Sequence, residues 1–96
     1  MIEIRQTDEY ARWFERLRDR QARMRIVIRI RRLSLGNFGD TKRLDEKISE
    51  IRINYGPGYR VYFTMRGKTL VILLAGGDKR TQARDIKRAL ELERNL

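Results

Sequence analysis

Apolar and polar residues follow two different periods along this chain, and the changes of period mark its elements. Residues 2–5 alternate apolar and polar side chains, which predicts a short strand. Thr7 follows as a helix N-cap, with acidic residues at positions 8 and 9 in the first turn. The helix that begins there carries one apolar stripe, which we expect to pack on a core. The stripe consists of Tyr10, Trp13, Phe14 and Leu17.

Residues 20–35 fit both a strand and a helix. The strand pattern uses Met24, Ile26, Ile28 and Ile30, whereas the helical stripe uses Ala22, Ile26, Val27, Ile30 and Leu33. Length favours a helix, because the pattern runs without a turn residue to Leu35 and stops at the segment 36–39, where two glycines provide a C-terminal signal. This helix carries six arginines and no acid: Arg20, Arg23, Arg25, Arg29, Arg31 and Arg32. They form a solvated face, a face that contacts RNA, or a face masked by an acidic partner segment.

The second half of the chain predicts a β-meander followed by a helix. Residues 41–46 form a polar connector, and alternation returns at 47–54 and at 59–65, on either side of Gly56-Pro57-Gly58. A near-continuous apolar run at 69–75 predicts a central strand buried on both faces. A last helix is expected from about Thr81 to Leu96.

These elements predict one α+β domain over residues 1–96. We expect a small, mostly antiparallel twisted sheet of about four strands. Two N-terminal helices pack on one face of this sheet, and a C-terminal helix completes the fold.

Loop lengths predict the register of the two hairpins. A three-residue loop at 56–58 sets Tyr55 opposite Tyr59, Asn54 opposite Arg60 and Arg52 opposite Tyr62. A two-residue loop at Gly67-Lys68 sets Met65 opposite Leu70, Phe63 opposite Ile72 and Val61 opposite Leu74. Arg52, Asn54, Arg60 and Tyr62 then share one face, and the glycine exit at 76–77 brings Lys79 and Arg80 to the same end of the sheet.

The charge of the chain indicates that this fold carries a binding surface. The chain has 23 Lys and Arg against 13 Asp and Glu, which gives a net charge of +10. Arginine outnumbers lysine, and its planar guanidinium suits phosphate and base stacking. A polyanionic partner such as nucleic acid is therefore expected, although genome composition or solubility also produces arginine-rich surfaces.

Missing residue types exclude several chemistries. The chain has no Cys and no His, which excludes disulfides, thiolate metal sites and every catalytic dyad built on imidazole. We expect no metal and no cofactor. Neither a secretory leader nor an apolar run of about 18 residues is visible, so we expect a cytoplasmic protein without a membrane partner.

The polar residues of the hairpin and of the glycine exit are the candidate site. As catalytic groups we predict Arg60, Lys79, Arg52 and Tyr62, where the arginines grip the scissile phosphate and spread the charge of the transition state. As RNA contacts we predict Asn54, Tyr55, Arg80, Gln82, Lys42 and Arg43. Two structural alternatives stay open: a Glu50–Arg52 ion-pair network, and an aromatic pair in which Tyr55 only holds the hairpin.

Two strings of the sequence, in this order and at this spacing, resemble a known family. They are the segment 50–63, EIRINYGPGYRVYF, and the segment 74–86, LAGGDKRTQARDI. They are similar to the HigB-type, phage Gp49-like branch of the RelE/ParE toxin superfamily, and the similarity covers nearly the whole chain. The resemblance implies the toxin of a type II toxin–antitoxin pair, neutralised by an antitoxin that is usually a helix-turn-helix, HigA-like protein. It is compatible with a dimer or with a toxin–antitoxin heterotetramer.

The resemblance also implies a chemistry. Relatives of the RelE and HigB kind enter the ribosomal A site and cut messenger RNA without metal, when the ribose 2′-OH attacks the adjacent phosphate. The arginine of the Gly-Tyr-Arg motif corresponds to Arg60, the cation after the glycine exit to Lys79, and the arginine of the Glu-x-Arg strand to Arg52. Many relatives carry a Tyr or His in the last helix or tail. That region of this chain has neither, so the general base is unassigned among Lys79, Tyr62 and Asp78.

Two other functions fit the same sequence. The superfamily contains ParE-like inhibitors of DNA gyrase, and a shared fold does not decide between activities. A non-catalytic RNA-binding module of phage origin is the third possibility.

Overall fold

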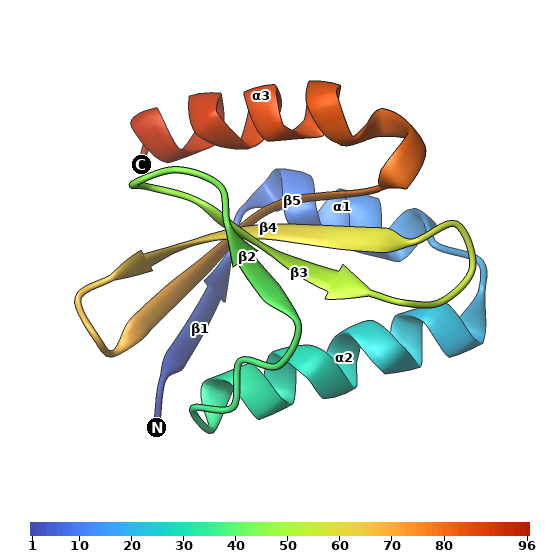
Figure 1. The fold of residues 1–96 in the computed structure, drawn as a ribbon, viewed down its shortest axis with the longest axis horizontal. Helices are drawn as coiled ribbons and strands as arrows, with labels where there is room; N and C mark the ends of the chain where they lie inside the picture. Colours follow the sequence, from blue (N-terminus) through green and yellow to red (C-terminus); the bar gives the residue numbers. More distant parts are fainter.

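The computed structural model describes residues 1–96 and contains one mixed five-stranded sheet with three α-helices (Figure 1). The elements are β1 (Glu3–Gln6), α1 (Asp8–Arg16), α2 (Arg20–Ser34), β2 (Thr41–Arg43), β3 (Ser49–Ile53), β4 (Tyr59–Arg66), β5 (Leu70–Asp78), a short 3₁₀ turn (Lys79–Thr81) and α3 (Gln82–Arg94). The strand order is β1-β5-β4-β3-β2. Only β1 runs parallel to its neighbour, and all other pairs are antiparallel.

The helices cover both faces of the sheet. Helices α1 and α2 lie on one face, over a core that includes Tyr10, Ile26 and Phe63. Helix α3 lies on the opposite face, where Ala89 packs against Tyr62. The predicted α+β class and the placement of both N-terminal helices on one face are therefore confirmed.

Both N-terminal helices begin at the capping residues that their sequences provide. The hydroxyl of Thr7 accepts a hydrogen bond from the backbone of Tyr10, and the carboxylate of Asp19 accepts from the backbone N–H groups of residues 21 and 22. The ambiguous segment is the helix α2, in which Ala22, Ile26 and Leu33 are buried. Val27, which the predicted stripe included, instead lies half exposed on the outer side of the helix.

The sheet has one strand more than the four that were expected, and the additional strand lies at one edge. Residues 41–46, expected as a connector, include the edge strand β2, which pairs with β3 through Lys42 opposite Glu50. Side-chain alternation could not reveal β2, because its three residues are all polar and suit a solvated edge. The N-terminal strand β1 joins the other edge, beside β5.

The first hairpin differs in register from the prediction by two residues. Its loop spans residues 54–58, so Arg52 lies opposite Arg60 and not opposite Tyr62. Gly56 and Gly58 both adopt positive φ angles, of 57° and 80°, which shape this longer loop. Because side chains alternate with a period of two, the shift keeps Arg52 and Arg60 on the face that was predicted.

The second hairpin differs for two reasons, a longer loop and an irregularity in the pairing. Its loop has three residues instead of two, so Arg66 lies opposite Leu70 and Phe63 pairs with Leu73 instead of Ile72. The register shifts by one more residue between Tyr62 and Phe63, so Val61 pairs with Gly76 instead of Leu74. A β-bulge of this kind adds a residue to one strand and reverses the faces beyond it. Leu74 and Ala75 accordingly both pack in the core beneath α3.

Two consecutive glycines lie near the end of β5, where both faces of the strand are crowded. A Cβ atom on Gly76 would lie 2.2 Å from Cε3 of Trp13 in α1. A Cβ atom on Gly77 would lie 1.8 Å from Oδ2 of Asp85 in α3. The glycines thus let one helix approach the end of the strand from each side, and they fix where the chain leaves the sheet toward Lys79.

Candidate functional site

The candidate site begins with two arginines on adjacent strands. Arg52 of β3 and Arg60 of β4 are direct cross-strand partners on the α3 face of the sheet. Like charges in this arrangement repel each other and destabilise the sheet unless an anion lies between them. The structure provides that anion within the same face.

Glu50 is the carboxylate that holds both arginines. Its side chain is completely buried, and its Oε2 atom lies 2.8 Å from Nε of Arg52 and 3.8 Å from Nε of Arg60. Its other oxygen accepts a hydrogen bond of 3.0 Å from the amide of Gln82, the first residue of α3. The Glu50–Arg52 network, which the sequence left open as a structural alternative, is therefore present. Arg52 takes part in it through Nε alone.

The ends of these side chains surround an open hollow of about 350 Å³. Besides loop backbone, the hollow is lined by three cations and one carboxylate: Arg52, Arg60, Lys79 and Asp40. The two Nη atoms of Arg52 and Nζ of Lys79 make no hydrogen bond or ion pair within the protein. Such unpaired donors around one hollow fit a phosphate group, because guanidinium and ammonium groups form charge-assisted hydrogen bonds with phosphate oxygens.

The loop between β3 and β4 fixes the position of Arg60. Its Nη1 atom donates to the carbonyl oxygens of Gly58 and Tyr59, at 3.0 and 3.1 Å. A Cβ atom on Gly58 would lie 3.4 Å from that nitrogen and 3.5 Å from Cβ of Lys79. Gly58 therefore has two functions. It leaves room for Arg60 and Lys79 to approach each other, and it adopts the positive φ angle that the loop requires.

Tyr62 does not reach the hollow. Its side chain is fully buried between the sheet and α3, and its hydroxyl makes no hydrogen bond. Burial, with a further contribution from the negative charge of Glu50, raises the pKa of Tyr62 far above its usual value. The predicted catalytic role of Tyr62 is corrected on this ground, because a buried, protonated phenol in this position cannot contact a phosphate in the hollow.

Asn54 and Tyr55, predicted as RNA contacts, have different surroundings. Asn54 lies in the loop, is exposed and lines the hollow. The hydroxyl of Tyr55 donates to the Asp19 carboxylate at 2.9 Å, and the guanidinium of Arg25 lies 4.7 Å from the centre of its ring. The bond from Tyr55 is the main reason why the pKa of Asp19 is lowered. Tyr55 thus connects the loop to the beginning of α2. This resembles the structural alternative in which Tyr55 only holds the hairpin.

The other predicted RNA contacts lie around the site without lining the hollow. Arg80 is exposed and bonded to Asp78, and Gln82 donates to Glu50. Lys42 and Arg43 are exposed on the edge strand β2, where Arg43 donates to two backbone carbonyls of the following turn. Of these four residues, Lys42 shares the cross-strand pair with Glu50 and therefore lies on the face of the two arginines.

Sequence reasoning missed Asp40 and assigned no function to Gln82 as a partner of Glu50. Asp40 precedes β2 and enters the site because its carbonyl oxygen accepts from the backbone of Arg52. No periodicity marks such a residue in a polar connector. The full burial of Glu50 was also invisible, since a glutamate on an alternating strand normally predicts a solvated position.

The structure contains no group of three or more acidic, His or Cys side chains placed to bind a metal ion. None of its helices combines the length and the apolar composition that crossing a lipid bilayer requires.

The arrangement of the sheet and helices matches a solved toxin structure. A mutant of the E. coli toxin RelE in the free state superposes with a TM-score of 0.67 over 91% of this chain and 96% of that chain, at 14% sequence identity. The sheet and its three helices thus have the RelE fold.

The family model of the phage-derived Gp49-like proteins matches residues 12–94, and the chain belongs to this family. An uncharacterized protein of Haemophilus influenzae is 46% identical over 95 residues, which covers 99% of this chain and 96% of that protein. These matches confirm the resemblance to the Gp49-like branch of the RelE superfamily that the two sequence strings indicated.

Proposed function

We propose that this protein is the toxin of a type II toxin–antitoxin pair and that it cleaves messenger RNA on the ribosome. The single observation that supports this proposal is the hollow lined by Arg52, Arg60 and Lys79, in which the Nη atoms of Arg52 and Nζ of Lys79 are unpaired donors around a space suited to one phosphate. Membership of the Gp49-like family and the RelE fold agree with it. A helix-turn-helix antitoxin would be the partner that neutralises the toxin.

In the proposed reaction the ribose 2′-oxygen attacks the adjacent phosphorus. A new O2′–P bond forms while the P–O5′ bond breaks, which leaves a 2′,3′-cyclic phosphate and a free 5′-hydroxyl. Arg52 and Arg60 stabilise the additional negative charge on the phosphate oxygens, and Lys79 neutralises the charge that develops on the leaving oxygen. Because Glu50 and the loop carbonyls hold Arg52 and Arg60 before the substrate arrives, these two groups need little reorganisation during the reaction.

Proton transfer from the 2′-hydroxyl requires a base at the rim of the hollow. Of the three groups that the sequence offered, Tyr62 is buried, and Asp78 is bonded to Arg80, whose hydrogen bond is the main reason that the pKa of Asp78 is lowered. Lys79 cannot be this base while it carries the positive charge that neutralises the leaving oxygen. Asp40 is the candidate that is left, as the one carboxylate that lines the hollow.

Induced expression tests the proposal, with growth and the 5′ ends of cellular messenger RNA as readouts. The native chain should arrest growth and produce new 5′ ends within translated regions. Arg60→Ala and Lys79→Ala should each lower the frequency of cuts by about 100-fold, the order expected when one charge-stabilising donor is lost. Lys68→Ala, which removes an exposed cation in the turn between β4 and β5, is the matched control and should cut normally.

Thermal unfolding of the purified variants shows whether the fold survives each substitution. Growth arrest that persists in the Arg60→Ala, Lys79→Ala double variant contradicts the proposal. Arrest with a DNA damage response and intact messenger RNA would instead identify a gyrase inhibitor. RNA affinity without cleavage or arrest would identify a non-catalytic binding module.

A further inference from the structure

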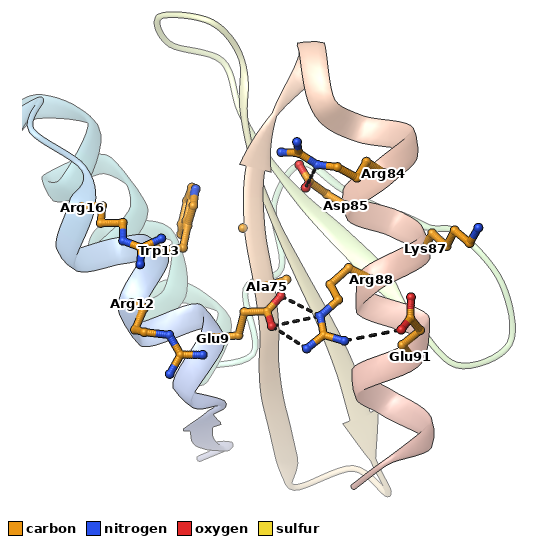
Figure 2. Close-up of a pocket in the computed structure, with 11 residues that line it drawn as sticks. Glu9, Arg12, Trp13, Arg16, Ala75, Arg84, Asp85, Lys87, Arg88 and Glu91 are labelled. Carbon is orange, nitrogen blue, oxygen red and sulfur yellow. Dashed lines mark hydrogen bonds and ion pairs between the residues drawn. The ribbon is translucent and has the colours of Figure 1, made fainter.

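A second, larger hollow of about 660 Å³ lies between α1 and α3, away from Arg52 and Arg60 (Figure 2). Figure 2 shows it with α1 on one side, α3 on the other and β5 between them. Its floor is the backbone of β5 at Ala75 and Gly76, and none of the three cations proposed to bind phosphate lines it. We call it the α1–α3 groove.

The edge of β5 is unpaired where it enters this groove. The ladder between β1 and β5 ends with Gln6 opposite Leu73, and Thr7 then bonds to the carbonyl oxygens of Leu73 and Leu74. Strand β5 continues to Asp78, and over residues 75–78 its only strand neighbour is β4. A strand edge with free N–H and C=O groups is a template for the addition of another strand.

Both walls of the groove carry positive charge. Arg12 and Arg16 project from α1, and Arg84, Lys87 and Arg88 project from α3. Three of these five cations are exposed and have no ion-pair partner in the protein: Arg12, Arg16 and Lys87. The lining also contains three carboxylates, Glu9, Asp85 and Glu91, which pair with Arg84 and Arg88. The groove beside the unpaired strand edge is therefore net positive, and Arg12, Arg16 and Lys87 are its free cations.

One ion pair crosses the groove. Nη2 of Arg88 lies 2.7 Å from Oε1 of Glu9, and this contact joins α3 to α1 in front of Ala75 (Figure 2). Its partners lie 79 positions apart in the sequence. The Glu9 carboxylate thus shows how an acidic group can be held at this position. Charged side chains over an open strand edge also protect it from pairing with the strands of other molecules.

We propose that the α1–α3 groove binds an extended acidic peptide segment of a partner protein, which adds to the sheet as a strand beside β5. Side chains of an added strand alternate between the two walls. Acidic residues facing α1 would meet Arg12 and Arg16, and those facing α3 would meet Arg84 and Lys87. A carboxylate of the peptide would replace Glu9 on Arg88. The proposal does not depend on ribonuclease activity.

The geometry favours a peptide over two other occupants, a nucleic acid and a second copy of this chain. A phosphodiester chain has no N–H and C=O groups at the repeat of a strand, so it would leave the edge of β5 unpaired. A second copy of this chain would bring its own Arg12, Arg16 and Lys87 against the same cations, and the like charges would repel each other.

Binding of a model peptide tests the proposal directly. The probe is a fluorescein-labelled, amidated octapeptide of alternating glutamate and valine, measured by fluorescence anisotropy with the purified protein. It should bind, whereas the matching peptide of alternating lysine and valine should not. On binding, amide hydrogen exchange at residues 75–78 should slow, because the added strand pairs with that edge. A peptide with N-methyl groups on alternate residues should bind at least about tenfold more weakly, since it cannot complete the backbone pairing.

Charge-reversal variants of the protein distinguish binding in the groove from general electrostatic attraction. Arg12→Glu combined with Arg16→Glu should weaken binding by at least about tenfold, and Arg84→Glu combined with Lys87→Glu on the opposite wall should do the same. Arg20→Glu combined with Arg31→Glu changes the net charge equally on exposed positions of α2 and should leave the affinity within about twofold. Circular dichroism confirms that each variant is folded.

Three results would overturn the proposal. The first is no binding of the acidic peptide, or equal weakening by the groove and α2 variants. The second is unchanged affinity of the N-methylated peptide, which would mean that no strand is added. The third is displacement of the peptide by a short single-stranded RNA with loss of protection at residues 75–78, which would identify the groove as a nucleic-acid site.

Discussion

Arg52 and Arg60 lie directly opposite each other on β3 and β4, so two cations occupy one cross-strand pair of the sheet. Their repulsion is offset by Glu50, whose carboxylate is buried beside both Nε atoms. This leaves the Nη atoms of Arg52 directed to the hollow that Lys79 also lines. One buried acid thereby permits a concentration of positive charge that an isolated pair of arginines could not maintain.

The Glu50→Gln variant should unfold more easily than the native protein. The amide keeps the size of the side chain but removes the charge that compensates two partly buried guanidinium groups, so we expect a loss of about 2–4 kcal/mol in the free energy of unfolding. Urea denaturation measures the difference. Glu3→Gln is the control, because its pair with Arg5 is more than half exposed and should contribute less than about 0.5 kcal/mol. Equal stability of the two variants would show that Glu50 does not hold the arginines.

Tyr62→Phe should keep both stability and activity. The hydroxyl is buried without a hydrogen-bond partner, so its removal should leave the free energy of unfolding unchanged or raise it by up to about 1 kcal/mol. Tyr62→Ala, which also removes the ring from the core, should cost about 3–5 kcal/mol. Growth arrest and urea denaturation are the measurements. Loss of RNA cleavage in a folded Tyr62→Phe variant would show that the hydroxyl of Tyr62 is catalytic.

Gly76→Ala should be destabilising through a contact with one identified side chain. The added Cβ atom would lie 2.2 Å from the ring of Trp13, and relief of this overlap requires movement of α1, at a cost of about 1–3 kcal/mol. The double variant with Trp13→Leu should recover part of this loss, and a double-mutant cycle measures the coupling. Additive effects of the two substitutions would mean that the glycine is needed for another reason.

The ion pair between Glu9 and Arg88 should make stability depend on pH. The hydrogen bond from Arg88 is the main reason that the pKa of Glu9 lies below its usual value of 4.5. Because the folded-state pKa is lowered, the stabilisation is fully present above pH 4.5 and is lost as the pH falls through the lowered value. Thermal unfolding of the native chain and of Glu9→Gln from pH 6 to pH 2.5 should show a difference that disappears at the acidic end. A difference that is independent of pH would exclude this ionic contribution.

Local patterns were sufficient to predict most of the elements and the three cations that line the hollow, Arg52, Arg60 and Lys79. The capping residues Thr7 and the glycines after Leu35 limit the first two helices, because these signals act within a few residues of the chain. The two arginines were placed on one face despite a wrong register, since an error of two residues preserves the side of the sheet. Their roles in catalysis remain predictions.

Contacts between distant segments decided the rest. The sequence by itself determined the helical and strand periods and the excess of positive charge, including the cations near the start of β4 and the end of β5. These features depend on composition and on neighbouring residues. Only the tertiary structure buried Glu50 against Gln82 of α3, tied Tyr55 to Asp19 and left one edge of β5 free between α1 and α3. These arrangements involve residues that are far apart in the chain, and their energies arise from burial and geometry that exist only after the sheet and helices have packed.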